Sequence, residues 1–287
     1  MKTKATLAIL AFCATAGVLH AENEESTNEE LLAKKPDKMF SMSAFADLES
    51  AYLCRGFVWD THLLSSQYAD GTMDLGPFGR ISAYAWSMLS KSPASHADGQ
   101  SCRFSEIDYG LRYAYDISLA EDWTLTSGAA KQWVTFPGRG YSDAHVVMDW
   151  QAFQALHNPY VTPYWRMRYI YKPFMEFYWV AGVKRTFPLF IKGLDLTFDF
   201  FGDLGDGRHC RNLFGPKPGR PYSSYRDGLQ SLNMVTRIDY RIADHVGVFA
   251  FVGIYSIVYE VARDAVKAMD NGTRDIAYGG VGVAVDF

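Results

Sequence analysis

Residues 105–117, Ser-Glu-Ile-Asp-Tyr-Gly-Leu-Arg-Tyr-Ala-Tyr-Asp-Ile, alternate apolar and polar side chains over their whole length. One face carries Ile107, Tyr109, Leu111, Tyr113, Tyr115 and Ile117, and the other carries Glu106, Asp108, Gly110, Arg112, Ala114 and Asp116. A period of two is the pattern of a β-strand. The stretch therefore predicts a strand with one apolar face rich in tyrosine and one charged face.

The same alternation recurs along the chain after residue 40, for example in residues 161–171, 194–200, 232–240 and 280–287. A soluble β-sandwich alternates in the same way. The apolar faces here end in Tyr, Trp and Phe, as the interfacial girdles of membrane barrels do. A sheet in lipid must close because an open edge leaves its backbone groups without partners. We therefore predict an all-β fold, a transmembrane antiparallel up-and-down β-barrel.

The lengths of the connections predict the number of strands. Short polar connections lie near residues 119–122, 157–160, 188–193 and 243–245, and long ones near 90–103, 137–143, 204–228 and 258–274. Bacterial barrels have short periplasmic turns and longer external loops. With Ser43–Phe57 as the first strand and Leu63–Leu75 returning before Phe78–Leu89, the total is twelve, with ten or fourteen as alternatives.

The N-terminal residues have the pattern of an export signal. Lys2 and Lys4 precede an apolar run over Ala5–Val18, and Leu19-His20-Ala21 ends in a small residue. The run is shorter than the roughly 20 apolar residues of a membrane helix, so residues 1–21 are predicted to be a cleaved signal peptide. Residues 22–40 are charged and are predicted to be a polar periplasmic segment. Residues 41–287 are predicted to form the barrel in the outer membrane of a bacterial cell.

Two short stretches resemble known outer-membrane proteins. Residues 50–56, Ser-Ala-Tyr-Leu-Cys-Arg-Gly, resemble the first strand of TorF-type porins, in which a Ser-x-Tyr-x-x-Arg-Gly stretch leads into the first external loop. Val281, Val283, Val285 and Phe287 resemble the C-terminal strand that the barrel assembly machinery reads. The resemblance implies a porin-like barrel with that machinery and outer-membrane lipid as partners.

The charged strand faces are predicted to line the lumen, because Arg or Lys facing lipid at the membrane midplane costs about 2–4 kcal/mol. The candidate pore-lining residues are Asp108, Arg112, Asp149, Arg166, Arg168, Asp195, Asp199, Arg237 and Asp239. Such side chains can select small polar solutes by size and charge, or they can pair internally and fill the lumen. We predict a porin-like channel for small polar solutes. A closed structural or surface-recognition barrel is the main alternative, and an outer-membrane lipid-modifying enzyme is a weaker one.

Other chemistry is weakly indicated. The formal net charge is −4, so there is no basic surplus to attract nucleic acid. The histidines match no metal or hydrolase spacing, and we expect no catalytic residues, cofactor or metal. Gly279, Gly280 and Gly282 are expected to pack closely rather than bind phosphate. Cys102 and Cys210 fall in predicted external loops and are candidates for a disulfide, with Cys54 as the competing partner.

Overall fold

The computed structural model describes residues 39–54, 57–60, 63–90, 103–135, 146–172, 175–214, 226–260, 263 and 275–287. The predicted signal peptide and nearly all of the predicted periplasmic segment lie outside these residues. No helix in the described part is long and apolar enough to cross a membrane.

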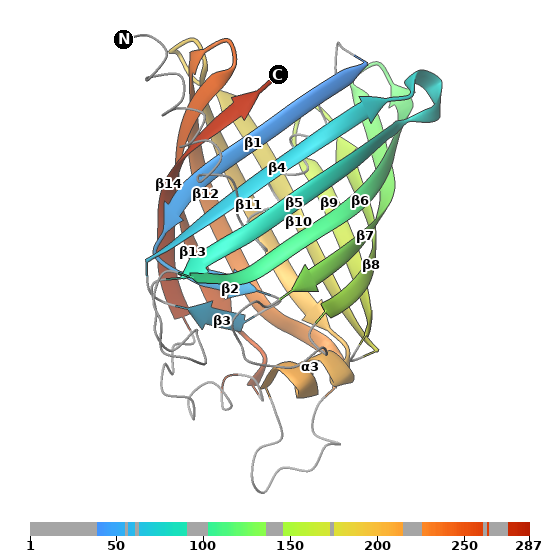
Figure 1. Cartoon of the computed structure of the whole chain (residues 1–287), viewed down its shortest axis with the longest axis vertical. Helices are drawn as coiled ribbons and strands as arrows, with labels where there is room; N and C mark the ends of the chain where they lie inside the picture. Colours follow the sequence, from blue (N-terminus) through green and yellow to red (C-terminus); the bar gives the residue numbers. More distant parts are fainter. Residues whose placement is uncertain are drawn as a thin grey trace, which may run out of the picture.

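Twelve antiparallel strands form a closed barrel (Figure 1). Along the chain they are β1 (Phe40–Glu49), β4 (Leu64–Asp74), β5 (Arg80–Ser90), β6 (Arg103–Ala120), β7 (Trp123–Thr135), β8 (Val146–His157), β9 (Thr162–Lys172), β10 (Glu176–Pro188), β11 (Leu194–Gly205), β12 (Gly228–Ala243), β13 (Val246–Ile257) and β14 (Asp275–Asp286). Each barrel strand pairs with the next barrel strand along the chain, so that β1 pairs with β4, and β1 also pairs with β14 to close the barrel. The predicted fold class and the predicted count of twelve strands are confirmed.

Four shorter elements are not part of the barrel wall. β2 (Tyr52–Cys54) and β3 (Phe57–Asp60) form a small sheet, and α3 is a helix over Gly207–Phe214. A single 3-10 turn, η1 (Gly76–Phe78), joins β4 to β5. The end of the barrel that carries α3, β2 and β3 is called the loop end below, and the opposite end, which carries the two described chain termini, is called the turn end (Figure 1).

The seam between β1 and β14 closes the barrel. Asp47 lies opposite Gly282 and Glu49 lies opposite Gly280 in this pair. At the turn end, the Met42 N–H donates to the Phe287 carbonyl oxygen at 3.1 Å, and the Phe287 N–H donates to the Met42 carbonyl oxygen at 2.8 Å. The last residue of the chain therefore completes the hydrogen bonding of the seam.

The first strand is shorter than the sequence predicted. We expected one strand over Ser43–Phe57, but β1 ends at Glu49 and the chain then leaves the wall to form β2 and β3. Ala51 and Leu53 are 1% and 6% exposed and pack in the core of the barrel. The burial of these two apolar side chains favours the departure of the chain from the wall.

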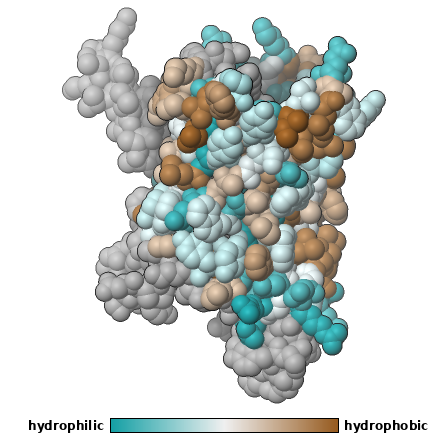
Figure 2. Space-filling model, turned by 90° about the vertical axis from the view of Figure 1, so that its right-hand side faces the viewer, coloured by the Kyte–Doolittle hydropathy of each residue, from teal (hydrophilic) through white to brown (hydrophobic). Residues whose placement is uncertain are grey.

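The outer surface is apolar along most of its height. In the described strands, away from their first and last residues, the outward positions carry only Lys131 and Arg185 as charged side chains. The Lys131 Nζ lies 4.9 Å from the ring centroid of Trp133 and 5.1 Å from that of Trp150. In Figure 2, brown, white and pale residues cover the middle of one side, while darker teal gathers towards the two ends. This distribution suits a lipid-facing wall with polar rims.

Candidate functional site

The inner wall carries most of the charge of the strands. Between the rims, the described inward positions hold twelve acidic and six basic side chains: Asp47, Glu49, Asp70, Glu106, Asp108, Asp116, Asp149, Glu176, Asp195, Asp199, Asp203 and Asp239, with Arg80, Arg112, Arg166, Arg168, Lys184 and Arg237. Each occupies the strand face opposite the apolar outer face. The lumen is therefore the candidate functional site, and its described wall has an acidic surplus.

A chain of polar side chains crosses β6, β7 and β8 in the loop-end half of the lumen. Gln132 Nε2 donates to Asp108 Oδ2, and Gln151 Nε2 donates to Gln132 Oε1. Gln151 Nε2 also lies 3.2 Å from Asp149 Oδ1. The next strand brings Arg168 into register with Gln151. All of these side chains are buried, so this part of the wall is a closed network rather than a solvated surface.

A second network joins β10, β11 and β12 near the loop end. Asp203 is fully buried, and its carboxylate accepts hydrogen bonds from Tyr178 Oη, Ser231 Oγ and Asn233 Nδ2, the last at 2.7 Å. On β9, Tyr164 Oη donates to Asp199 Oδ1 at 2.9 Å. Three donors satisfy the Asp203 carboxylate, which fixes the relative positions of the three strands at this level.

The turn-end half of the lumen holds ion pairs that are less buried. Arg237 Nη2 lies 2.6 Å from Asp239 Oδ1 on the same strand, and the Arg237 guanidinium sits 3.9 Å from the Phe249 ring centroid. Arg80 Nη1 lies 2.5 Å from Asp116 Oδ2. The other oxygen of this carboxylate, Oδ1, accepts a hydrogen bond from Thr126 Oγ1 at 2.6 Å. In these two pairs each arginine charge is therefore balanced by an aspartate charge.

The nine pore-lining candidates occupy inward positions but do not form one cluster. Asp108, Asp149, Arg166, Arg168 and Asp199 are buried, whereas Arg112, Asp195, Arg237 and Asp239 are half-buried. Within this second group, Arg237 pairs with Asp239, and Asp195 lies opposite Asp239 in the register. Arg112 stands apart from that group, with its guanidinium 4.9 Å from the Tyr84 ring centroid.

Sequence reasoning missed several inward charges, among them Glu176, Lys184 and Asp203. On β10, both faces are aromatic near the loop end, because Phe177 and Trp179 point outward while Tyr178 points inward. In this part of β10 the sequence therefore does not alternate between polar and apolar residues, so it does not show which face is inward. Glu176 and Lys184 lie an even number of residues from Tyr178 and therefore on the same face of the strand. That spacing was the only sequence feature that could have predicted their inward orientation.

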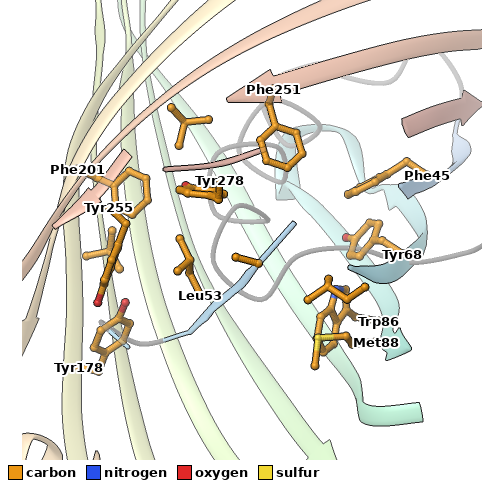
Figure 3. Close-up of a cluster of buried hydrophobic side chains, with 14 of the residues drawn as sticks. Phe45, Leu53, Tyr68, Trp86, Met88, Tyr178, Phe201, Phe251, Tyr255 and Tyr278 are labelled. Carbon is orange, nitrogen blue, oxygen red and sulfur yellow. The ribbon is translucent and has the colours of Figure 1, made fainter. Parts of the chain in front are cut away.

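The sequence also did not predict that the lumen contains aromatic side chains. Phe45, Tyr68, Tyr84, Trp86, Phe249, Phe251, Tyr255 and Tyr278 point inward from β1, β4, β5, β13 and β14 and are buried. Figure 3 shows Leu53 of β2 inside the barrel among several of these rings, with Tyr178, Tyr255 and Tyr278 around it. The segment that follows β1 therefore fills part of the lumen towards the loop end.

The helix α3 also contributes buried groups at the loop end. His209 is 1% exposed, and its Nδ1 lies 3.0 Å from Glu176 Oε1 on β10. The His209 ring centroid lies 5.1 Å from that of Tyr178. Cys210 is fully buried and belongs to the same apolar core as Leu53. Thus the His209–Glu176 pair and the burial of Cys210 both hold α3 against the barrel.

Cys210 carries a thiol in the structure, and Gln230 Nε2 donates to its Sγ at 3.0 Å. Cys102 lies outside the described residues, so the Cys102–Cys210 disulfide stays a prediction. Burial raises the pKa of the Cys210 thiol to about 11, which leaves almost no thiolate at pH 8. Iodoacetamide should therefore label Cys210 in the folded protein about 100-fold more slowly than an exposed cysteine.

Peptide mapping after unfolding separates the two states of Cys210. If Cys210 carries a thiol, it should label on unfolding without any reductant. Labelling of Cys210 only after reduction, together with a linked Cys102 peptide, would instead establish the disulfide. Rapid labelling in the folded barrel would contradict the burial of this thiol between α3 and the barrel.

No protein-family model and no curated protein matches the sequence. The TorF-type resemblance of residues 50–56 therefore stays a prediction.

The solved structures similar to this chain include outer-membrane porins, a channel and a translocator domain. The KdgM porin has 9% identity and a TM-score of 0.46, with 86% of this chain and 99% of that chain covered. An outer membrane channel from Pseudomonas putida F1 has 10% identity and a TM-score of 0.47, with coverage of 88% and 100%. The translocator domain of the autotransporter NalP from Neisseria meningitidis has 10% identity and a TM-score of 0.44, with coverage of 92% and 95%. Similarity this low carries over no solute and no activity.

Proposed function

We propose that this protein is a bacterial outer-membrane channel for small polar solutes. The observation that carries the proposal is the closed barrel with an apolar outer surface and a charged inner wall. A sheet closed on itself satisfies its backbone hydrogen bonds without water, as the interior of a membrane requires. The loop-end half, which is packed by Leu53 and the aromatic side chains around it, acts as the constriction.

The proposal includes the route to the membrane. Residues 1–21 direct export and are removed, residues 22–40 stay in the periplasm, and the turn end faces the periplasm. The assembly machinery recognises β14, whose outward valines lead to Phe287. The exposed Phe287 ring stacks on His245 with their centroids 5.6 Å apart, at the closing seam.

The charge of the wall supports a preference for cations. Twelve acidic side chains face six basic ones on the described inner wall. The ion pairs Arg80–Asp116 and Arg237–Asp239 cancel equal numbers of each sign, so the surplus is acidic. An acidic lining raises the local concentration of cations and lowers that of anions.

Planar bilayers test both parts of the proposal. The purified barrel should give steady conductance steps, and a potassium chloride gradient should give a reversal potential of the sign that indicates a preference for potassium. Asp239→Asn should shift that potential towards the anion-selective direction, whereas Asp244→Asn, in the β12–β13 turn, serves as the control. A preference for chloride in the native barrel would contradict the cation assignment.

A closed structural or surface-recognition barrel is the second candidate, because the described lumen is packed towards the loop end. Bilayer records without any conductance would favour that candidate. We do not propose a catalytic role. The His209–Glu176 pair is buried between α3 and β10, and the Tyr178 ring beside His209 donates to Asp203 in the internal network that holds the strands.

A further inference from the structure

A pocket of about 670 Å³ lies on the outside of the barrel at the loop end. It is lined by Met175, Phe177, Trp179, Asp206, Gly207, Arg208, Arg211 and Asp227. Phe177 and Trp179 occupy the outward positions of β10, and the two arginines come from α3. The pocket is therefore separate from the lumen, and no part of the proposed solute path passes through it.

Its aromatic floor belongs to a stack of outward rings. The Phe177 ring centroid lies 4.7 Å from that of Tyr169 on β9 and 5.7 Å from that of Trp179. On β6 and β7, Tyr109 and Trp133 stack in the same way, with centroids 5.6 Å apart. Outward aromatic rings near the end of a membrane barrel mark the level of the lipid head groups. The pocket thus opens where head groups meet the acyl chains.

The acids in the pocket are engaged by the backbone. The Asp206 carboxylate accepts the Phe177 N–H at 3.1 Å and the His209 N–H at 2.6 Å. Asp227 Oδ1 accepts the Gly207 N–H at 2.7 Å. The Phe177 bond holds the start of α3 against β10, and all three bonds place backbone donors on the two carboxylates, which partly offsets their negative charge.

The basic side chains are placed differently. Arg208 is exposed, and its Nη1 donates to the Met175 carbonyl oxygen at 3.2 Å. A guanidinium has five N–H donors. The bond to Met175 uses one of them, and the others can donate to a further acceptor. Arg211 stands one helical turn further along α3 and lines the same pocket.

We infer that this pocket binds the phosphorylated head group of a lipid in the surrounding leaflet. Guanidinium groups match phosphate oxygens in charge and geometry. The rings of Phe177 and Trp179 line the same pocket as the arginines and contact the apolar part of the same lipid. The inference rests on the barrel lying in a membrane, but it does not depend on conductance through the lumen.

Native mass spectrometry tests this inference on the full-length mature barrel in detergent. The probe is a phosphorylated glycolipid, compared with its dephosphorylated form. The native barrel should retain the phosphorylated lipid, and Arg208→Ala/Arg211→Ala should weaken that retention by about tenfold, as expected for losing a charge-assisted hydrogen bond. Arg241→Ala is the matched control, because Arg241 is a half-exposed arginine at the turn end. It should bind as the native protein does.

Two further measurements identify the source of the phosphate and guard against misfolding. Inorganic phosphate at millimolar concentration should not displace the lipid, and displacement at that level would assign the site to free phosphate and overturn the lipid assignment. Arg208→Gln alters only an exposed side chain, so it keeps the barrel folded and should still weaken retention. Equal retention of both lipid forms, or unchanged binding in the arginine variants, would refute the inference even if the protein conducts ions.

Discussion

Replacing residues 51–62 with Asn-Gly should raise the conductance of the barrel severalfold. Glu49 lies directly opposite Leu64 in the β1–β4 register, which places Ser50 opposite Leu63. Two residues can join strands in that arrangement, and Asn-Gly is the preferred pair for such a hairpin. The variant therefore keeps the wall of twelve strands and removes Ala51, Leu53 and the small β2–β3 sheet from the lumen.

Single-channel recording in planar bilayers measures the change, and gel migration with and without heating shows whether the barrel is folded. Leu53→Ser and Leu63→Ser form a matched pair, because Leu53 is 6% exposed and Leu63 is 47% exposed. Leu53→Ser should increase conductance and lower stability by about 2–4 kcal/mol, whereas Leu63→Ser should change neither. A folded loop variant with native conductance would mean that another element, such as α3, sets the constriction.

The strand pattern could be predicted because successive residues of a membrane barrel strand face lipid and lumen in turn, so that their polarity alternates. In residues 105–117, the alternating side chains fix both the strand and its orientation, and β6 has that orientation. Connection lengths then set the strand count, since each short turn must return the chain to the same rim. The prediction needed only local polarity and chain length.

The contents of the lumen could not be predicted in the same way. In β13, residues 246–257 are almost all apolar, so the inward Phe249 and Phe251 do not differ in polarity from the outward Val252 and Ile254. The departure of the chain after Glu49 depends on contacts between Leu53 and rings from distant strands. Ion pairs between strands, such as Arg80–Asp116, likewise require the register, which polarity alone does not determine.

The seam offers the second large effect, because Gly280→Val should prevent normal closure of the barrel. A Cβ at Gly280 would lie 2.6 Å from Phe251 Cε1 and 2.7 Å from the Leu48 carbonyl oxygen on β1. Valine otherwise suits a strand, and Val281, Val283 and Val285 already occupy β14, so the expected defect comes from steric overlap alone. Overpacking of this kind costs about 1–3 kcal/mol, and more where backbone must move.

Urea unfolding in detergent and the heat-dependent shift on gels should show a lower midpoint and a smaller folded fraction for Gly280→Val. Gly228→Val is the matched control, since a Cβ at Gly228 would meet no atom within 4 Å. Adding Phe251→Ala to Gly280→Val should restore part of the loss, because it vacates the ring position while the Leu48 carbonyl oxygen stays in place. The two substitutions should therefore be non-additive, as contacting residues are. A native unfolding midpoint for Gly280→Val would show that the ring and the seam can both move aside, and that a glycine is not required where the first and last strands meet.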